Sequence, residues 1–222
     1  MPWYSGAMAE ELGLRERKKR QTERRVWRTA VELFLERGFE KVSVQEIAAA
    51  ADVSKMTVFN YYGSKEDLVL KPMEHHADDA ARAVRERGPG ESALAAVYRQ
   101  FVELLEQRDP SVGLSDNSEV LNIRRLIVET PDLLLRAHAS RMHGLRQLAE
   151  VLAQESDGDR MSAQVAAGQL MAARNALINE NHRRLLAGES ADAVYPDAVA
   201  AARRAFGLVE RGLGDYALRP AE

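Results

Sequence analysis

Residues 43–65 read SVQEIAAAADVSKMTVFNYYGSK, a stretch that predicts two short helices joined by a tight turn. Ser43 and Ser54 stand where an N-cap hydroxyl is useful, one before each helix. Val58 and Tyr62 are four residues apart in the second helix, so both can face a core. The stretch therefore has the form of a helix-turn-helix whose second helix is the reader.

The second helix leaves a set of chemically varied side chains on its outward side: Lys55, Met56, Thr57, Asn60 and Tyr61. Ammonium, hydroxyl, amide and phenol groups on one short helix suit the base edges and phosphates of a DNA major groove. Met56 suits the methyl group of a thymine. We expect these five residues to meet base edges.

Basic charge is concentrated just before this stretch. Residues 15–28 carry eight basic and two acidic side chains, whereas residues 66–222 carry 19 basic and 25 acidic ones, and the whole chain has a net charge of −3. Such segregation is typical of a DNA-binding surface. We interpret the basic segment as an arm or frayed turn that orders on phosphates, with a solvated helix start as the alternative. The other expected DNA contacts, mainly to phosphates, are Arg15, Lys18, Lys19, Ser43, Gln45, Ser54 and Lys65.

The longer run GFEKVSVQEIAAAADVSKMTVFNYYGSKEDL, residues 38–68, resembles the DNA-binding segment of TetR-type transcriptional repressors. It departs from the family's pattern at four positions. Asp52 replaces a common glycine, Met56 a small residue, Phe59 a tyrosine and Gly63 a proline. The resemblance implies a homodimer that binds double-stranded DNA and a C-terminal body that encloses a small-molecule pocket.

The rest of the chain predicts an all-α fold of about nine helices, because no strand pattern is found. The resemblance implies that this fold is TetR-like. We expect a three-helix helix-turn-helix domain over residues 14–63 and a C-terminal helical bundle, for ligand binding and dimerisation, over residues 64–216. The helix expected from residue 64 to residue 87 contains Pro72, which either kinks it or divides it into two segments, the first ending at Lys71 and the second beginning at Met73. The bend is a candidate pivot or merely a tolerated kink. The expected helices are 14–37, 43–50, 55–62, 64–87, 91–108, 118–129, 132–155, 160–187 and 192–212.

A ligand site in the body is expected where polar groups interrupt apolar helices, since a buried polar group needs a partner. The candidates are Met73, Asn122, Arg125, Met171, Arg174, Asn175, Asn179 and His182. Hydrogen bonds between helices are the alternative role for each. The runs NIRRLIVETPDLL and ALINENHRRLLAGE also resemble a subset of actinobacterial-type regulators, some of which sense long-chain acyl-CoA. We therefore expect a small hydrophobic effector.

The last two long helices carry more apolar or small positions than one core face needs. Val165, Gly168, Gln169, Ala172, Ala173 and Ala176 form a small-residue seam, and Val199, Ala202, Phe206, Val209 and Leu213 form an apolar stripe. A four-helix interface between two copies would use both surfaces. Extra core packing is the alternative.

The composition of the chain argues against a membrane-spanning or a secreted protein. The chain has 222 residues, 45% hydrophobic and 29% charged, without an apolar run long enough for a membrane span. Its N-terminus lacks the order of a signal peptide, and the absence of cysteine excludes disulfides and thiolate catalysis, so we expect a cytoplasmic protein.

No catalytic motif is found, and the five histidines have poor spacing for a shared metal ion, so we expect no enzyme, metal or cofactor. The predicted function is a ligand-responsive transcriptional regulator. It would repress by binding a near-palindromic operator as a homodimer, although activation stays open. The alternative is a helical interaction or enzymatic bundle with a vestigial helix-turn-helix.

Overall fold

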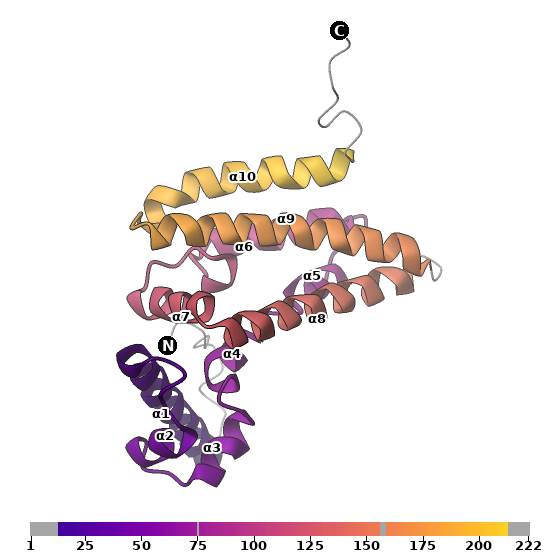
Figure 1. Ribbon diagram of the computed structural model, residues 1–222. Coiled ribbons are helices and arrows are strands. Elements are labelled where there is room, and N and C mark those ends of the chain that lie inside the picture. Colours follow the sequence, from indigo (N-terminus) through magenta and orange to yellow (C-terminus); the bar gives the residue numbers. More distant parts are fainter. Residues whose placement is uncertain (1–12, 75, 156–158, 213–222) are drawn as a thin grey trace. The chain divides into compact units, whose positions relative to one another are not determined.

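The computed structural model describes residues 13–74, 76–155 and 159–212, and within these ranges the chain is helical, with no strand. The described ranges contain ten α-helices and one short 3-10 helix. Figure 1 labels the α-helices along the chain. The all-α class is confirmed. The helices are α1 (Leu14–Arg37), α2 (Val44–Ala50), α3 (Lys55–Tyr62), α4 (Asp67–Glu74), α5 (Asp79–Arg85), α6 (Ala93–Glu106), η2 (Pro110–Val112), α7 (Ser118–Glu129), α8 (Pro131–Glu155), α9 (Arg160–Leu186) and α10 (Ala191–Arg211).

Helix contacts divide the chain into two compact units. The first contains Met1–His75 and Asn117–Ser140, and the second contains His76–Asp116 and Arg141–Glu222. This structural division differs from the functional division predicted between residues 63 and 64, which stays a prediction.

The first unit has a continuous apolar core made by α1 to α4, α7 and the first turns of α8. Trp27 and Phe34 of α1 are buried at its centre, and the Phe34 ring lies 4.9 Å from that of Phe39. Gly38 ends α1 with a φ of 86°, which favours glycine. Ile123 and Ile127 of α7 are buried in the same core. Two segments far apart in sequence therefore stabilise the helix-turn-helix together.

The segment between residues 64 and 87 forms two helices, which agrees with the predicted alternative of a division, but α4 continues past Lys71 to Glu74 and α5 begins at Asp79. Pro72 lies inside α4, two residues before its end, and is buried. Proline has no N–H to continue the ladder, which makes an early end to the helix favourable. The next helix, α5, begins at Asp79. This split explains why ten α-helices are found in the described residues instead of nine.

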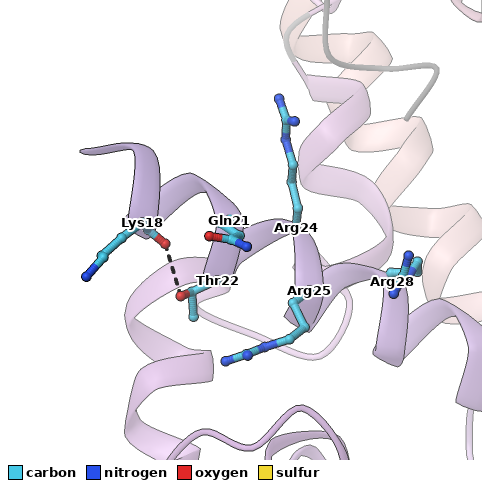
Figure 2. A pocket seen from close by; sticks show the side chains of 6 residues that line it. All are labelled: Lys18, Gln21, Thr22, Arg24, Arg25 and Arg28. Carbon is cyan, nitrogen blue, oxygen red and sulfur yellow. Dashed lines mark hydrogen bonds between the residues drawn. The ribbon is translucent and has the colours of Figure 1, made fainter. Parts of the chain in front are cut away.

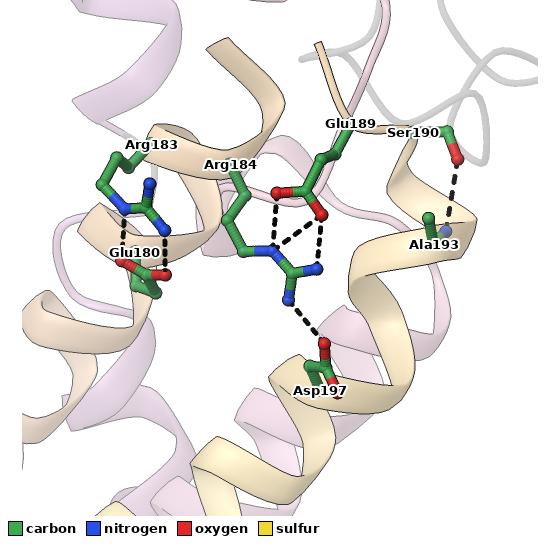
Figure 3. Close-up of polar contacts among 7 residues, drawn as sticks. All are labelled: Glu180, Arg183, Arg184, Glu189, Ser190, Ala193 and Asp197. Carbon is green, nitrogen blue, oxygen red and sulfur yellow. Dashed lines mark hydrogen bonds and ion pairs between the residues drawn. The ribbon is translucent and has the colours of Figure 1, made fainter. Parts of the chain in front are cut away.

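The second unit is built from α5, α6, η2, α9, α10 and the later turns of α8. Helices α9 and α10 pack side by side (Figure 1), and Phe206 of α10 contacts Tyr98 and Phe101 of α6 with ring centroids 5.4 and 6.1 Å apart. Figure 3 shows the turn between α9 and α10, where Arg184 pairs with both Glu189 and Asp197. Ser190 caps α10 by accepting a hydrogen bond from the Ala193 N–H.

No helix of the described residues is long and apolar enough to cross a membrane.

Candidate nucleic-acid interface

Helix α3 has one face in the core and one face exposed. Its N-cap Ser54 accepts a hydrogen bond from the Thr57 N–H at 3.0 Å, and its hydroxyl also lies 2.8 Å from the Thr57 hydroxyl. Val58 and Tyr62 are buried, and the Tyr62 hydroxyl donates to the Glu23 carbonyl of α1 at 2.9 Å. The hydrogen bond and the buried face fix the orientation of α3 on α1.

The outward side of α3 presents Lys55, Met56, Phe59 and Asn60, all exposed, with Thr57 and Tyr61 partly buried. The structure therefore brings together the five expected base-contacting residues. It adds Phe59, which the sequence list omitted although its departure from the family's tyrosine singled it out.

The turn before α3 has an unusual backbone conformation at its centre. Asp52 has a φ of 50°, in the left-handed region where glycine is preferred and aspartate is tolerated. The Val53 N–H donates to the Ala48 carbonyl at 3.0 Å, and Val53 packs partly buried against the core. Asp52 thus takes the conformation that a glycine would take, and the turn keeps its geometry.

Helix α2 begins with a complete capping box. The Ser43 N–H and hydroxyl both donate to Glu46 at 2.8 Å, and the Glu46 N–H donates back to the hydroxyl. The backbone hydrogen bond from Ser43, the hydroxyl bond and Arg37 together lower the pKa of Glu46 to about 2. Ser43 and Gln45 are exposed, as phosphate contact would require.

The basic segment before this motif is helical from Leu14, so the interpretation as an arm or frayed turn was wrong. Side chains of α1 line a surface hollow of about 600 Å³ (Figure 2), and most of them are cationic. The lining residues are Lys18, Gln21, Thr22, Arg24, Arg25 and Arg28. The Thr22 hydroxyl donates to the Lys18 carbonyl at 3.1 Å. The side chain of Arg15 lies outside the part that the structure describes.

A second hollow joins this basic helix to the reading helix. It has a volume of about 690 Å³ and is lined by Glu16, Lys18, Lys19, Thr22 and Tyr61. Cations of α1 and the phenol of α3 therefore share one concave surface. A concave cationic surface beside the exposed face of a short helix is complementary to the phosphates that border a DNA groove.

Lys65 occupies a different environment from the helix start expected for it. Helix α4 begins at Asp67, whose N–H donates to the Ser64 hydroxyl at 3.1 Å. The Lys65 ammonium lies 4.3 Å from the centroid of the Phe39 ring and 5.8 Å from that of Phe34. A cation–π contact of this kind holds the ammonium beside the core.

The structure separates the eight candidate ligand residues between the two units. Met73, Asn122 and Arg125 belong to the first unit, where Met73 packs on the core, Asn122 is partly buried and Arg125 is exposed. The other five lie on α9 in the second unit. Arg174 and His182 are buried there, Met171 and Asn175 are partly buried, and Asn179 is exposed.

Arg174 belongs to a buried polar network that the sequence did not reveal. Its guanidinium donates to the Gln100 side chain at 3.0 Å, and Gln100 donates to the Asp79 carbonyl at 3.0 Å. The Asp79 side chain is 2% exposed, and its carboxylate contacts His76 at 3.0 Å and pairs with Arg82. The network joins α5, α6 and α9.

The network also shifts the pKa values of its members. Burial alone would lower the pKa of His76, but the hydrogen bond and charge of Asp79 raise it above its ordinary 6.5. Burial opposes ionisation of Asp79, but His76 and Arg82 hold its pKa below the usual value. Burial lowers the pKa of Arg174, and the negative charge of Asp79 counteracts this effect.

Asn181 is a further buried polar residue of α9 that the sequence list omitted. Its side-chain amide donates to the Val112 carbonyl at 2.9 Å and holds η2 against α9. Its position four residues after the buried Leu177 is the pattern that could have placed it on the inner face. Within the described residues, no group of three or more histidine, aspartate or glutamate side chains is placed to hold a metal ion.

Comparison with known proteins agrees with this geometry. A family model described as "Bacterial regulatory proteins, tetR family" matches residues 27–71, from Trp27 in α1 to Lys71 in α4. The regulator TcmR of Streptomyces glaucescens is 36% identical over 123 residues, which cover 55% of this chain and 54% of TcmR. The transcriptional regulator MftR of Mycobacterium tuberculosis is 30% identical over 154 residues, 64% of this chain and 69% of MftR.

The chain spans about half or less of the length of TcmR and of two further regulators, from Bacillus subtilis. Among solved structures, native NalD, the secondary repressor of the MexAB-OprM multidrug efflux pump in Pseudomonas aeruginosa, matches with a TM-score of 0.56. That match has 18% identity and covers 84% of this chain and 97% of NalD, so it supports the fold alone. By its helix-turn-helix sequence, its extended match to MftR and its fold, the chain belongs to the TetR family of bacterial regulatory proteins.

Proposed function

We propose that this protein is a ligand-responsive transcriptional regulator that represses by binding a near-palindromic operator as a homodimer. The observation that carries the proposal is the capped, outward-facing helix α3 beside the cationic face of α1. The family relationship supports the same function. A repressor needs no activity beyond occupying its operator, and such a protein would act in the cytoplasm, where the chromosome is.

A dimer is proposed because a palindromic site needs two reading helices about one helical turn apart. The surface of α9 supports this assembly: Val165, Gln169, Ala172 and Ala176 of the predicted seam are exposed in the single chain. In α10, Ala202 and Phe206 are already buried, whereas Val199 and Val209 are partly accessible. Leu213 lies outside the described residues.

Release would require an effector that binds one conformation of the body more tightly than the other. We propose a small, predominantly hydrophobic effector held in the body. Buried polar groups such as Arg174 would give it orientation, because a few placed polar groups in an apolar site usually do so.

The test is binding of the purified protein to the DNA upstream of its own coding sequence, at two salt concentrations and against random duplex competitor. We expect specific binding that weakens steeply with salt. Asn60→Ala should weaken operator binding more than binding to random DNA. Lys18→Ala should weaken both equally and reduce the salt slope by about one unit. Equal affinity for upstream and random DNA at both salt concentrations would overturn the proposal.

Effector binding is tested separately by adding a panel of small metabolites to the protein–operator complex. Release by one compound, with the compound bound more tightly by free protein than by the complex, is the expected result. A compound that binds both forms equally would not be the effector.

A further inference from the structure

The exposed face of α3 carries two large apolar side chains next to each other. Met56 is 67% exposed and Phe59 is 39% exposed, and they are three residues apart on one helix. Single exposed apolar residues are common on protein surfaces. Here, however, two of the eight residues of α3 are exposed in this way, although Val58 and Tyr62 already anchor the helix in the core.

Cationic and polar groups surround this apolar pair. The Lys55 ammonium lies 5.8 Å from the centroid of the Phe59 ring, and Asn60 is exposed beside it. The hollow shared by α1 and α3 is lined by Lys18, Lys19 and Tyr61 together with Glu16 and Thr22, so two cations and one anion border it. An apolar centre with a cationic border is complementary to the floor of a DNA major groove between two rows of phosphates.

The thymine methyl is the one apolar group among the base-edge features that distinguish the four base pairs in that groove. Phe59 has no hydroxyl with which to contact a phosphate, and neither side chain can donate a strong hydrogen bond to a base. Side chains three residues apart are separated by about 4.5 Å along a helix axis. Successive bases on one strand are about 3.4 Å apart. The pair therefore fits two neighbouring thymines.

We propose that Met56 and Phe59 form a reading surface for the methyl groups of two neighbouring thymines in each operator half-site. This inference rests on the proposed function, and it goes beyond it by giving part of the sequence that the protein selects. Asn60 and Lys55 would supply hydrogen bonds and charge at the flanking positions.

The test replaces each thymine of the operator, one at a time, by deoxyuridine, which lacks only the methyl group. We expect one or two neighbouring positions in each half-site where this change weakens binding by about three- to fivefold, the effect of exposing one buried methyl-sized group. The same change elsewhere in the operator should have no effect.

Protein variants assign the two positions. Met56→Ala should abolish the difference between thymine and deoxyuridine at one of them, and Phe59→Ala at the other. Leu35→Ala is the matched control, because Leu35 is also an exposed apolar residue of the first unit, 42% exposed, but lies on α1. It should keep the full difference at both positions. Thermal unfolding of each variant verifies that the fold is intact, as expected for exposed side chains.

Two failures are distinguishable. If the protein selects an operator but binds every deoxyuridine version equally, or if both variants keep the full difference, the thymine inference is overturned and the proposed function stands. If no sequence is preferred over random DNA, both are overturned.

Discussion

Gly144 has the closest Cβ contact among the glycines that the structure describes. A Cβ built on this position of α8 would lie 2.2 Å from the Ala77 carbonyl oxygen, which is backbone and cannot rotate away. Gly144→Ala should therefore lower the free energy of unfolding by about 2–3 kcal/mol, a typical cost of overpacking. Urea denaturation measures the change.

The matched control is Gly207→Ala in α10, where the new Cβ would meet only the Arg211 guanidinium, 3.5 Å away. Removing a helical glycine there should raise the unfolding free energy by about 0.5–1 kcal/mol. If Gly144→Ala were as stable as the control, the contact with Ala77 would not exist in solution.

The pKa of the Glu46 carboxyl group tests the capping box of α2. Its pKa of about 2 lies below the ordinary 4.5, so its contribution to the stability of α2 is complete above pH 4.5 and is lost as the pH falls through about 2. Ser43→Ala removes the hydroxyl bond but keeps the backbone one, so the pKa should rise only partway towards 4.5. NMR titration of the Glu46 carboxyl measures it, and Ser54→Ala, which alters a different cap, should leave it in place.

Local chemistry made these caps predictable from the sequence. The hydroxyls of Ser43, Ser54 and Ser64 each accept a hydrogen bond from the N–H of the third residue after them. A serine directly before a helical pattern is enough to predict such a cap. Gly144 could not be singled out in this way, because its constraint comes from a carbonyl 67 residues earlier in the chain.

The α5–α6–α9 network should give the second unit a pH-dependent stability with two limits. Asp79 has a lowered pKa, so its contribution is lost as the pH falls below its ordinary 3.8. His76 has a raised pKa, so its contribution is present below 6.5 and is lost as the pH rises through the raised value. Besides Asp79, the charged groups that act on His76 are Asp109 and Arg82. Stability should be greatest between these limits.

Asp79→Asn should flatten both arms of this profile and lower the unfolding free energy by about 2 kcal/mol at pH 5.5, because His76 and Arg82 lose their common anion. Urea denaturation at pH 3, 5.5 and 8 measures this change. Asp78→Asn is the control, since Asp78 is a half-exposed neighbour that pairs with Arg82 and Arg85. Retention of both arms in Asp79→Asn would show that other groups cause them.

Periodicity identified most helices, but it could not identify the network or the ends of α4 and α5. Proline signalled a disturbance at Pro72, but the sequence did not show that α4 continues to Glu74 or that the buried Asp79 begins α5. The candidate ligand residues show the same limit. Asn179 and Asn181 are equally polar in the sequence, but only Asn181 lies on the buried face of α9.

For the whole molecule, the proposed dimer predicts a sharp response at the exposed seam of α9. Ala172→Arg would place a guanidinium in an apolar four-helix interface and should weaken dimerisation by about a hundredfold or more, since an unpaired buried charge costs several kcal/mol. Sedimentation equilibrium measures the dissociation constant. Operator binding should weaken in parallel.

Ala139→Arg on α8 is the matched control for this experiment, because Ala139 is also an exposed helical alanine. It should leave both the dimer and DNA binding unchanged. If Ala172→Arg also remained dimeric, the proposed α9–α10 interface would be wrong, and the two reading helices would have to be paired in another way.

The all-α class followed from the sequence because each helix carries its own apolar stripe. Which helices belong to which of the two compact units did not follow from the sequence. Ile123, Ile127 and Leu133 pack in the core of α1, although the chain reaches them only after α5 and α6. Such long-range pairing depends on which apolar faces meet, and a one-dimensional pattern holds no information about that choice.

The loop that contains η2 packs closely against α9. Gly113, with a φ of 74°, lies so close to α9 that a Cβ there would be 2.7 Å from the Ile178 carbonyl, and Asn181 holds the neighbouring Val112 carbonyl. This loop cannot detach without exposing those contacts to solvent. The N–H groups of Val112 and Gly113 donate to the carbonyls of Asp109 and Pro110 within this turn, so deuterium uptake at these two amides would report how often the turn opens. Slower labelling after a metabolite is added would reveal binding that stabilises this loop, without any DNA in the sample.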